Sequence, residues 1–171
     1  QEARGVNPKP PLARALRLIL TAWLAMLATA GLAAQPLDLD DTGHQQVWRH
    51  MEILLDPQGS MELAAVRRAH AEGRFHAAPS QSASLGYLPG AAWVRLAIRN
   101  PGTTARSRWL QQHWVFQQSS ILFVVRGDGT ERRFANGAEV PLDHRPVQSR
   151  LILFPLEMAA GEVLEVYGRL S

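Results

Sequence analysis

The sequence contains no cysteine among its 171 residues. This absence excludes a disulfide scaffold, a lipid-anchored N-terminal cysteine and any thiolate metal site. A domain of this composition must be stabilised by its hydrophobic core. The roughly 137 residues that follow position 34 are enough to bury one.

An excess of positive charge is also missing once the first 34 residues are set aside. The whole chain has a formal charge of +3, but residues 1–34 hold four basic residues and a single acidic one. The remainder carries 14 basic and 14 acidic residues and is formally neutral. The composition therefore gives no indication of nucleic-acid binding.

Spacings typical of metal centres and catalytic sites are missing too. The six histidines show no H-x-H, H-x-x-x-H or H-E-x-x-H pattern, which zinc sites commonly have. No serine lies in a nucleophile-elbow motif, and no carboxylates suggest the flanking pair that a glycosidase needs. We therefore expect no metal, no cofactor and no enzymatic activity. A hydrolase of the cell envelope would require two carboxylates that only folding brings together.

Residues 1–34 have the layout of a secretory signal peptide. Arg14 and Arg17 form a positive n-region, residues 18–30 are uncharged and apolar, and small residues at 28–33 offer cleavage sites. A retained membrane anchor is the alternative, because residues 18–34 are at the lower limit for spanning roughly 30 Å of hydrocarbon. Under both interpretations the part of the chain after residue 34 is exported.

The exported part has the pattern of an antiparallel, all-β sandwich with one short helix. We expect a polar linker at residues 35–46 and one domain at residues 47–171. Ser60 can cap the helix and Gly73 can end it. Period-2 patterns between Gly- and Pro-containing turns predict strands. These strands are expected at 47–55, 92–99, 108–116, 120–126, 130–134, 149–157 and 163–170.

The order of motifs from residue 47 onwards resembles a known family. The segment LGYLPGAAWVRLAIRNPG is followed by Trp109, and then by ILFVVRGDG, GAEVPLDHRP, LFPLEMAAGE and VYGRLS. In this order and spacing the motifs resemble the second type of extracellular domain in bacterial seven-transmembrane receptors with diverse intracellular signalling modules. The resemblance covers residues 47–171.

The resemblance implies a jelly-roll-like sandwich, similar to carbohydrate-binding modules, on the periplasmic side of the bacterial inner membrane. It also implies a sensor that binds a small ligand, with carbohydrate as the class suggested by fold similarity. The signal would pass to membrane helices and to an intracellular output module outside this chain. Three alternatives stay open: a protein partner, pairing of two copies, and a free carbohydrate-binding or adhesion module of the cell envelope.

Four residues are candidates for contacting a ligand: Trp93, Arg95, His144 and Arg145. Alternation places Trp93 and Arg95 on the face of their strand that is opposite its aliphatic residues. We expect that face to be exposed or to line a cleft. A flat indole ring can stack on a sugar, but a tryptophan can equally be a large core residue.

The stretch Asp143-His144-Arg145 lies in a predicted loop. Adjacent side chains diverge, so these three cannot converge on one substrate atom unaided. The alternative interpretation is structural: Asp143 accepts a turn hydrogen bond, and Arg145 pairs with a carboxylate or a backbone carbonyl. For a ligand, we expect the contact region to be the loops 127–130 and 136–148 at one end of the sandwich.

Overall fold

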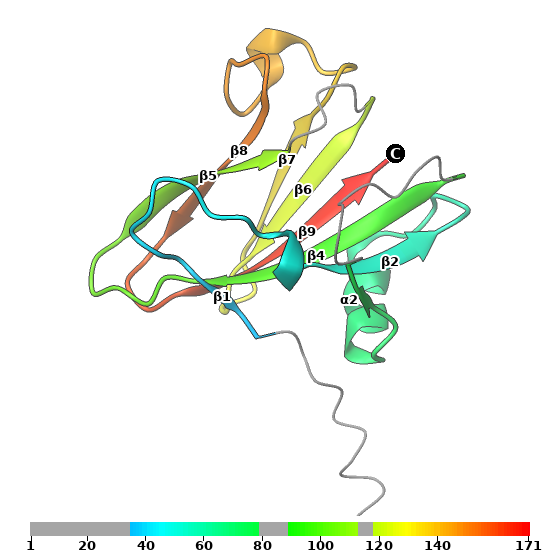
Figure 1. Ribbon diagram of the computed structural model, residues 1–171. Helices are drawn as coiled ribbons and strands as arrows, with labels where there is room; N and C mark the ends of the chain where they lie inside the picture. Colours follow the sequence, from blue (N-terminus) through cyan, green and yellow to red (C-terminus); the bar gives the residue numbers. More distant parts are fainter. Residues whose placement is uncertain (1–34, 79–88, 113–117) are drawn as a thin grey trace, which may run out of the picture. The chain divides into compact units, whose positions relative to one another are not determined.

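A computed structural model describes residues 35–78, 89–112 and 118–171. In these residues the chain is an all-β sandwich with one short α-helix, as the sequence predicts (Figure 1). The predicted signal peptide lies outside the described residues. So does Trp114, the second tryptophan of the predicted strand 108–116.

The larger of the two sheets has the strand order β3-β2-β4-β9-β6-β7. Neighbouring strands in this order are antiparallel, and Figure 1 shows β9 between β4 and β6. A further short strand, β1, pairs in parallel with the end of β4. The strands are β1 (Leu37–Asp38), β2 (Glu52–Asp56), β3 (His76–Ala77), β4 (Ala91–Arg99), β6 (Ser120–Val125), β7 (Glu131–Asn136) and β9 (Val163–Leu170).

The second sheet is the antiparallel pair β5 (Arg106–Gln112) and β8 (Ile152–Met158). Its inward side chains, such as Phe154, pack against one face of the larger sheet, which contributes Leu96 and Ile98. These three side chains are almost fully buried. The alternating pattern of each strand therefore supplies one side of a shared core between two layers.

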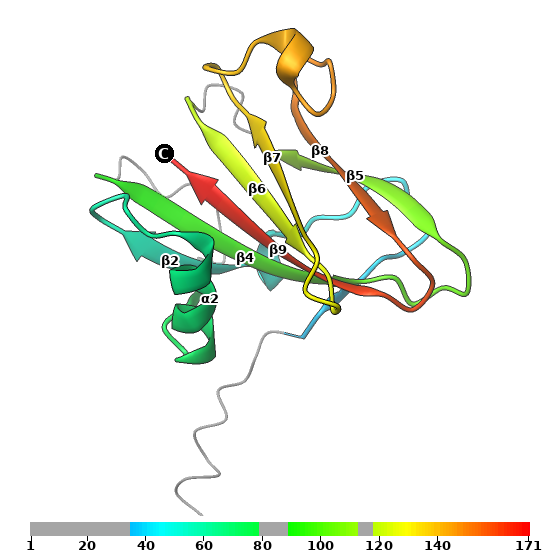
Figure 2. The ribbon, with the colours of Figure 1, turned by 180° about the vertical axis from the view of Figure 1, so that it is seen from behind.

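The opposite face of the larger sheet is covered in part by α2 (Leu63–Ala71), which is seen in front of the sheet in Figure 2. Leu63, Val66 and Ala69 are spaced three apart, and all are buried. They pack with Trp93 of β4 and other buried side chains in a second core cluster. The predicted helix and its buried face are confirmed.

The ends of α2 agree with the prediction only in part. Gly73 has a φ of 70° and donates its N–H to the carbonyl of His70, so it ends the helix as expected. Ser60 does not cap the helix, because Glu62 occupies the cap position and no side chain caps it. Instead, the Asp56 carboxylate accepts the Met61 N–H at 2.8 Å and fixes the turn before the helix.

The first predicted strand, 47–55, is shorter than expected. A single 3-10 turn, η1 (Trp48–His50), precedes β2, which begins at Glu52. Val47 and Met51, on either side of this turn, both pack against the core, and their apolar character alone does not distinguish a turn from a strand. Within the expected linker 35–46, Leu37 of β1 is buried in the same core.

The loops 127–130 and 136–148 do not share one end of the sandwich, so our expectation for them is wrong. The first joins β6 to β7, and the second follows the other end of β7. Two loops that flank a single strand must lie at opposite ends of it. The second loop contains the 3-10 turn η2 (Leu142–His144).

Both core clusters are formed by residues from 37 onwards, and residues 34–171 form one compact unit. We therefore expect this part of the chain to fold without the residues before it. In the described ranges no helix has the length and apolarity needed to cross a membrane.

Candidate functional site

Trp93 and Arg95 are buried, with only 1% and 5% of their surfaces exposed. Of the two alternatives for this face of β4, exposure is therefore wrong, whereas Trp93 does line a pocket, described below. The reason is α2, which packs over that face. Strand alternation shows which residues share a face, but it cannot show that a helix from another segment covers it.

Arg95 is held between two carboxylates on neighbouring strands. It donates to Glu52 of β2 at 2.7 Å and to Glu165 of β9 at 2.6 Å. The Tyr167 hydroxyl donates to Glu165 at 3.1 Å, and His70 Nε2 of α2 lies 3.5 Å from Glu52. This network joins the helix to three strands.

The network shifts the pKa values of its members. Burial alone would raise the pKa of Glu165, but the hydrogen bond and charge of Arg95 outweigh it and lower that pKa. Burial lowers the pKa of His70, and the nearby Arg95 charge acts in the same direction. Burial and the Glu165 charge raise the pKa of Tyr167. The ion pairs are therefore formed at neutral pH, with His70 neutral.

Arg145 donates to three backbone carbonyls of its own loop. Its Nε reaches Val140 at 2.9 Å, Nη2 reaches Gly137 at 3.0 Å and Nη1 reaches Ser149 at 3.2 Å. All three nitrogens of the guanidinium are therefore engaged in holding the loop. This is the structural interpretation that the sequence offered for Arg145.

His144 lies at the end of η2 with 73% of its side chain exposed. Its closest charged neighbour is Asp143, 4.0 Å away. Trp93 and Arg95 lie on one face of β4, and no hydrogen bond or ion pair joins either of them to His144 or Arg145. The structure does not bring the four candidate residues together, and a ligand contact by any of them stays a prediction.

A pocket of about 280 Å³ lies beside the start of α2. We call it the helix-end pocket. Its lining is formed by residues 59–62 before the helix and by Trp93, Ile121, Phe123, Arg133 and Arg169 from four neighbouring strands.

The helix-end pocket combines an aromatic wall with polar groups. The rings of Trp93 and Phe123 are stacked, with centroids 5.9 Å apart. The indole nitrogen of Trp93 has almost no accessible surface and no hydrogen-bond partner among the described residues.

The two arginines of the pocket differ in their partners. Arg169 donates to the carbonyl of Gly59 at 2.9 Å and to the hydroxyl of Ser171 at 3.2 Å. Arg133 is exposed and forms no hydrogen bond or ion pair with the described part of the chain. The lining also includes the exposed carboxylate of Glu62.

Sequence reasoning missed Ile121, Phe123, Arg133 and Arg169. The positions of Phe123 and Arg133 could have been predicted, because the turn at 127–129 sets the register of its hairpin. That register places Arg133 directly opposite Phe123. The approach of Gly59 to Arg169, 110 residues away, has no such local signal.

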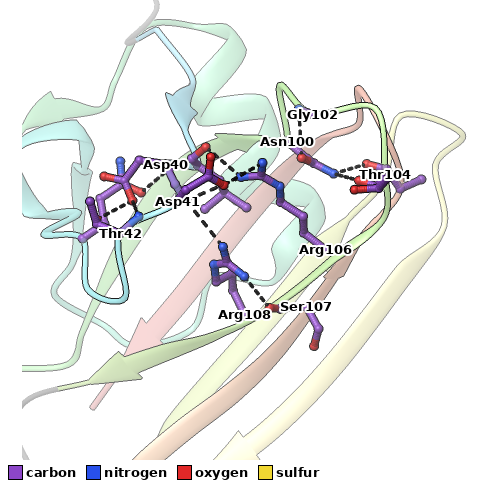
Figure 3. Close-up of polar contacts among 12 residues, drawn as sticks. Asp40, Asp41, Thr42, Asn100, Gly102, Thr104, Arg106, Ser107 and Arg108 are labelled. Atoms are coloured by element: carbon purple, nitrogen blue, oxygen red, sulfur yellow. Dashed lines mark hydrogen bonds and ion pairs between the residues drawn. The ribbon is translucent and has the colours of Figure 1, made fainter.

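A second, more open hollow of about 480 Å³ lies at residues 105–107, Arg126 and residues 157–159. Its arginines already have partners. Arg106 pairs with Asp41 at 2.9 Å (Figure 3), and Arg126 pairs with Glu162. Figure 3 also shows Arg108 donating to the carbonyl of Asp40. These contacts hold the segment at Asp40 and Asp41 against β5.

Trp109 is the most exposed of the large hydrophobic side chains in the described residues, with 60% of its surface accessible. It lies on the outer face of the β5–β8 pair, opposite Pro155. Gln111 and Ser107 flank it on the same face. An open indole between polar side chains is a second surface suited to ligand contact.

Two packed layers and a single helix define an all-β sandwich domain. The sequence profile of the 7TMR-DISM extracellular 2 family matches residues 48–171. The chain therefore belongs to this family of extracellular sensor domains of seven-transmembrane receptors, and the resemblance found in the sequence is confirmed. Comparison with curated proteins gives no match.

Proposed function

We propose that this domain binds a small ligand on the periplasmic side of a bacterial inner membrane, reached through export by residues 1–34. It passes the signal to membrane helices and an intracellular output module outside this chain. It is a binding domain and performs no catalysis. The family supports the receptor context, and the helix-end pocket supports the location of the ligand.

The observation that carries this proposal is the stacked pair Trp93 and Phe123, which lines the pocket together with Arg133 and Arg169. An aromatic wall beside polar groups is typical of small-molecule sites. The second hollow is less suited to a ligand, because its arginines are engaged within the protein.

The pocket also offers a route for the signal. Arg169 lines it and donates to Gly59 on one side and Ser171 on the other. A ligand that accepts hydrogen bonds from Arg169 would act directly on the last residues of β9. In our proposal the chain continues from there towards the membrane, and the ligand shifts the receptor by binding one conformation better than another. Pairing of two copies stays a prediction.

A thermal-shift screen of residues 34–171 against sugars, amino acids, organic acids and envelope fragments tests the proposal. A ligand at a hundredfold excess over Kd adds about 2.7 kcal/mol of stability. Ile121→Trp fills the pocket, and Ile53→Trp on β2 is the matched control, because Ile53 is also a half-buried isoleucine and does not line the pocket. We expect a saturable shift that Ile53→Trp keeps and Ile121→Trp loses. A shift that both variants keep would contradict the proposed site.

Trp109 favours a second candidate function, a carbohydrate-binding or adhesion module of the cell envelope. Its exposed ring on a flat sheet face suits stacking against the C–H face of a sugar. Trp109→Ala should then abolish binding to a glycan array while leaving the unfolding midpoint nearly unchanged. Retention of glycan binding by this variant would remove the candidate.

A further inference from the structure

We propose that the helix-end pocket selects a small organic monoanion, a carboxylate joined to a flat ring or a compact apolar group. This inference rests on the proposed function and specifies the chemistry of the same site. It follows from the charge, the aromatic wall and the size of the pocket.

The charge of the pocket favours an anion. Arg133 faces the pocket from β7 and Arg169 from β9, and β6 lies between these strands. Arg133 lies opposite Phe123 and Arg169 lies opposite Ile121, so two strand spacings of about 4.8 Å and two residues along the strands separate their backbones. Two long arginine side chains can bridge this distance around one bound group. Arg133 pairs with no side-chain carboxylate of the described residues. Arginine binds carboxylates through paired, charge-assisted hydrogen bonds.

Glu62 limits the charge of the ligand. It is the single carboxylate in the pocket lining and is exposed to solvent. A second anionic group on the ligand would meet repulsion from it. One negative group, bound on the side of the arginines, fits this distribution.

The size and the wall of the pocket define the rest of the ligand. Trp93 and Phe123 present stacked rings, with Ile121 beside them in the lining. An apolar cavity of about 150 Å³ holds benzene. The 280 Å³ of this pocket therefore has room for one ring and one carboxylate group.

The test compares two probes of nearly equal shape, phenylacetate and its neutral analogue phenylacetamide. Both are titrated into residues 34–171 while the indole N–H resonances are followed by NMR, with the Trp93 signal assigned from Trp93→Phe. We expect phenylacetate to shift this signal, because the Trp93 ring lines the pocket, and to bind at least tenfold more tightly than the amide. Arg133→Gln should weaken phenylacetate binding about tenfold.

Arg132→Gln is the matched control, because Arg132 is exposed on the other face of the same strand. It should bind phenylacetate like the wild type. Equal affinity for acid and amide, or equal losses in the two arginine variants, would overturn the anion inference and leave the proposed function intact. If a neutral ligand binds the wild type and Ile121→Trp abolishes that binding, the anion inference is also overturned and the proposed function is left intact. Binding of every ligand by Ile121→Trp would instead overturn the proposed site itself.

Discussion

The rings of Trp93 and Phe123 are stacked, with centroids 5.9 Å apart and planes inclined by 24°. Trp93 is buried beneath α2 and Phe123 is half-buried at the pocket. One aromatic pair thus belongs both to the core and to the candidate binding site. Changes at Trp93 can be designed to separate these two roles.

Trp93→Phe should cost much less stability than Trp93→Ala. The indole N–H has no partner among the described residues, so its removal breaks no hydrogen bond with them. Loss of the whole ring leaves a cavity and should cost about 3–5 kcal/mol. Urea unfolding of the two variants measures the difference. Equal losses would mean that the N–H contributes a hydrogen bond to the folded state.

Arg95→Met should lower the free energy of unfolding by about 3 kcal/mol or more, because it leaves Glu52 and Glu165 close together without their cation. Arg99→Met is the matched control on the same strand, since Arg99 pairs with Asp38 at the surface. Its effect should be much smaller. Urea unfolding compares the two variants, and similar losses would contradict the role of the buried network.

Stability should decrease as the pH falls below 6.5. The pKa of folded His70 lies below its ordinary value of 6.5, so the unfolded chain binds more protons between the two values. Stability is therefore fully present above pH 6.5 and is lost as the pH falls through the folded pKa. Glu165, whose pKa is lowered from 4.5, adds a further loss in more acidic solution.

His70→Gln should remove the part of this pH dependence that lies just below 6.5. Chemical unfolding between pH 5 and 7.5 gives the slope for each variant. His144→Gln, at an exposed position of η2, is the control and should keep the slope of the wild type. If the His70 variant also kept it, burial of that imidazole would not be the cause.

Gly90→Ala should destabilise the domain more than Gly129→Ala. Both glycines have positive φ, 82° and 85°, which costs an alanine about 1 kcal/mol. At Gly90 a Cβ would also lie 2.4 Å from the Asp56 carbonyl oxygen, whereas nothing lies within 4 Å at Gly129. Thermal unfolding of both variants measures the added cost. Equal midpoints would show that the backbone at Gly90 yields easily.

Much of the fold can be predicted from local sequence. Alternation and turn residues gave β4 and the β6–β7 hairpin, and three-residue spacing gave the buried face of α2. Contacts between distant segments could not be predicted in this way. Neither the packing of α2 over Trp93 nor the approach of Gly59 to Arg169 leaves a periodic signal.

The candidate site was harder to predict for the same reason. Trp93 was identified as a candidate from its residue type, but its burial depends on a helix about 30 residues away in the chain. Arg145 was identified from its loop, and its three carbonyl partners become visible only in the folded structure. The type of residue could be chosen from sequence, but its surroundings could not.

Arg145→Ala should speed amide hydrogen exchange in residues 137–149. The variant loses three hydrogen bonds to backbone carbonyls of this loop, and those carbonyls hold the segment together. Arg145→Lys should restore only part of the protection, because an ammonium group cannot reproduce the fork of the guanidinium. Unchanged exchange in both variants would show that the loop is held by other contacts.

The most direct test of the account is amide hydrogen exchange of residues 34–171 with and without the strongest ligand from the thermal-shift screen. We expect slower exchange at residues 59–62 and at residues 169–171, the two segments that Arg169 joins. The β5–β8 pair around Trp109 should be unaffected. Protection confined to that pair, with none beside Trp93, would contradict the central claim that the ligand binds in the helix-end pocket.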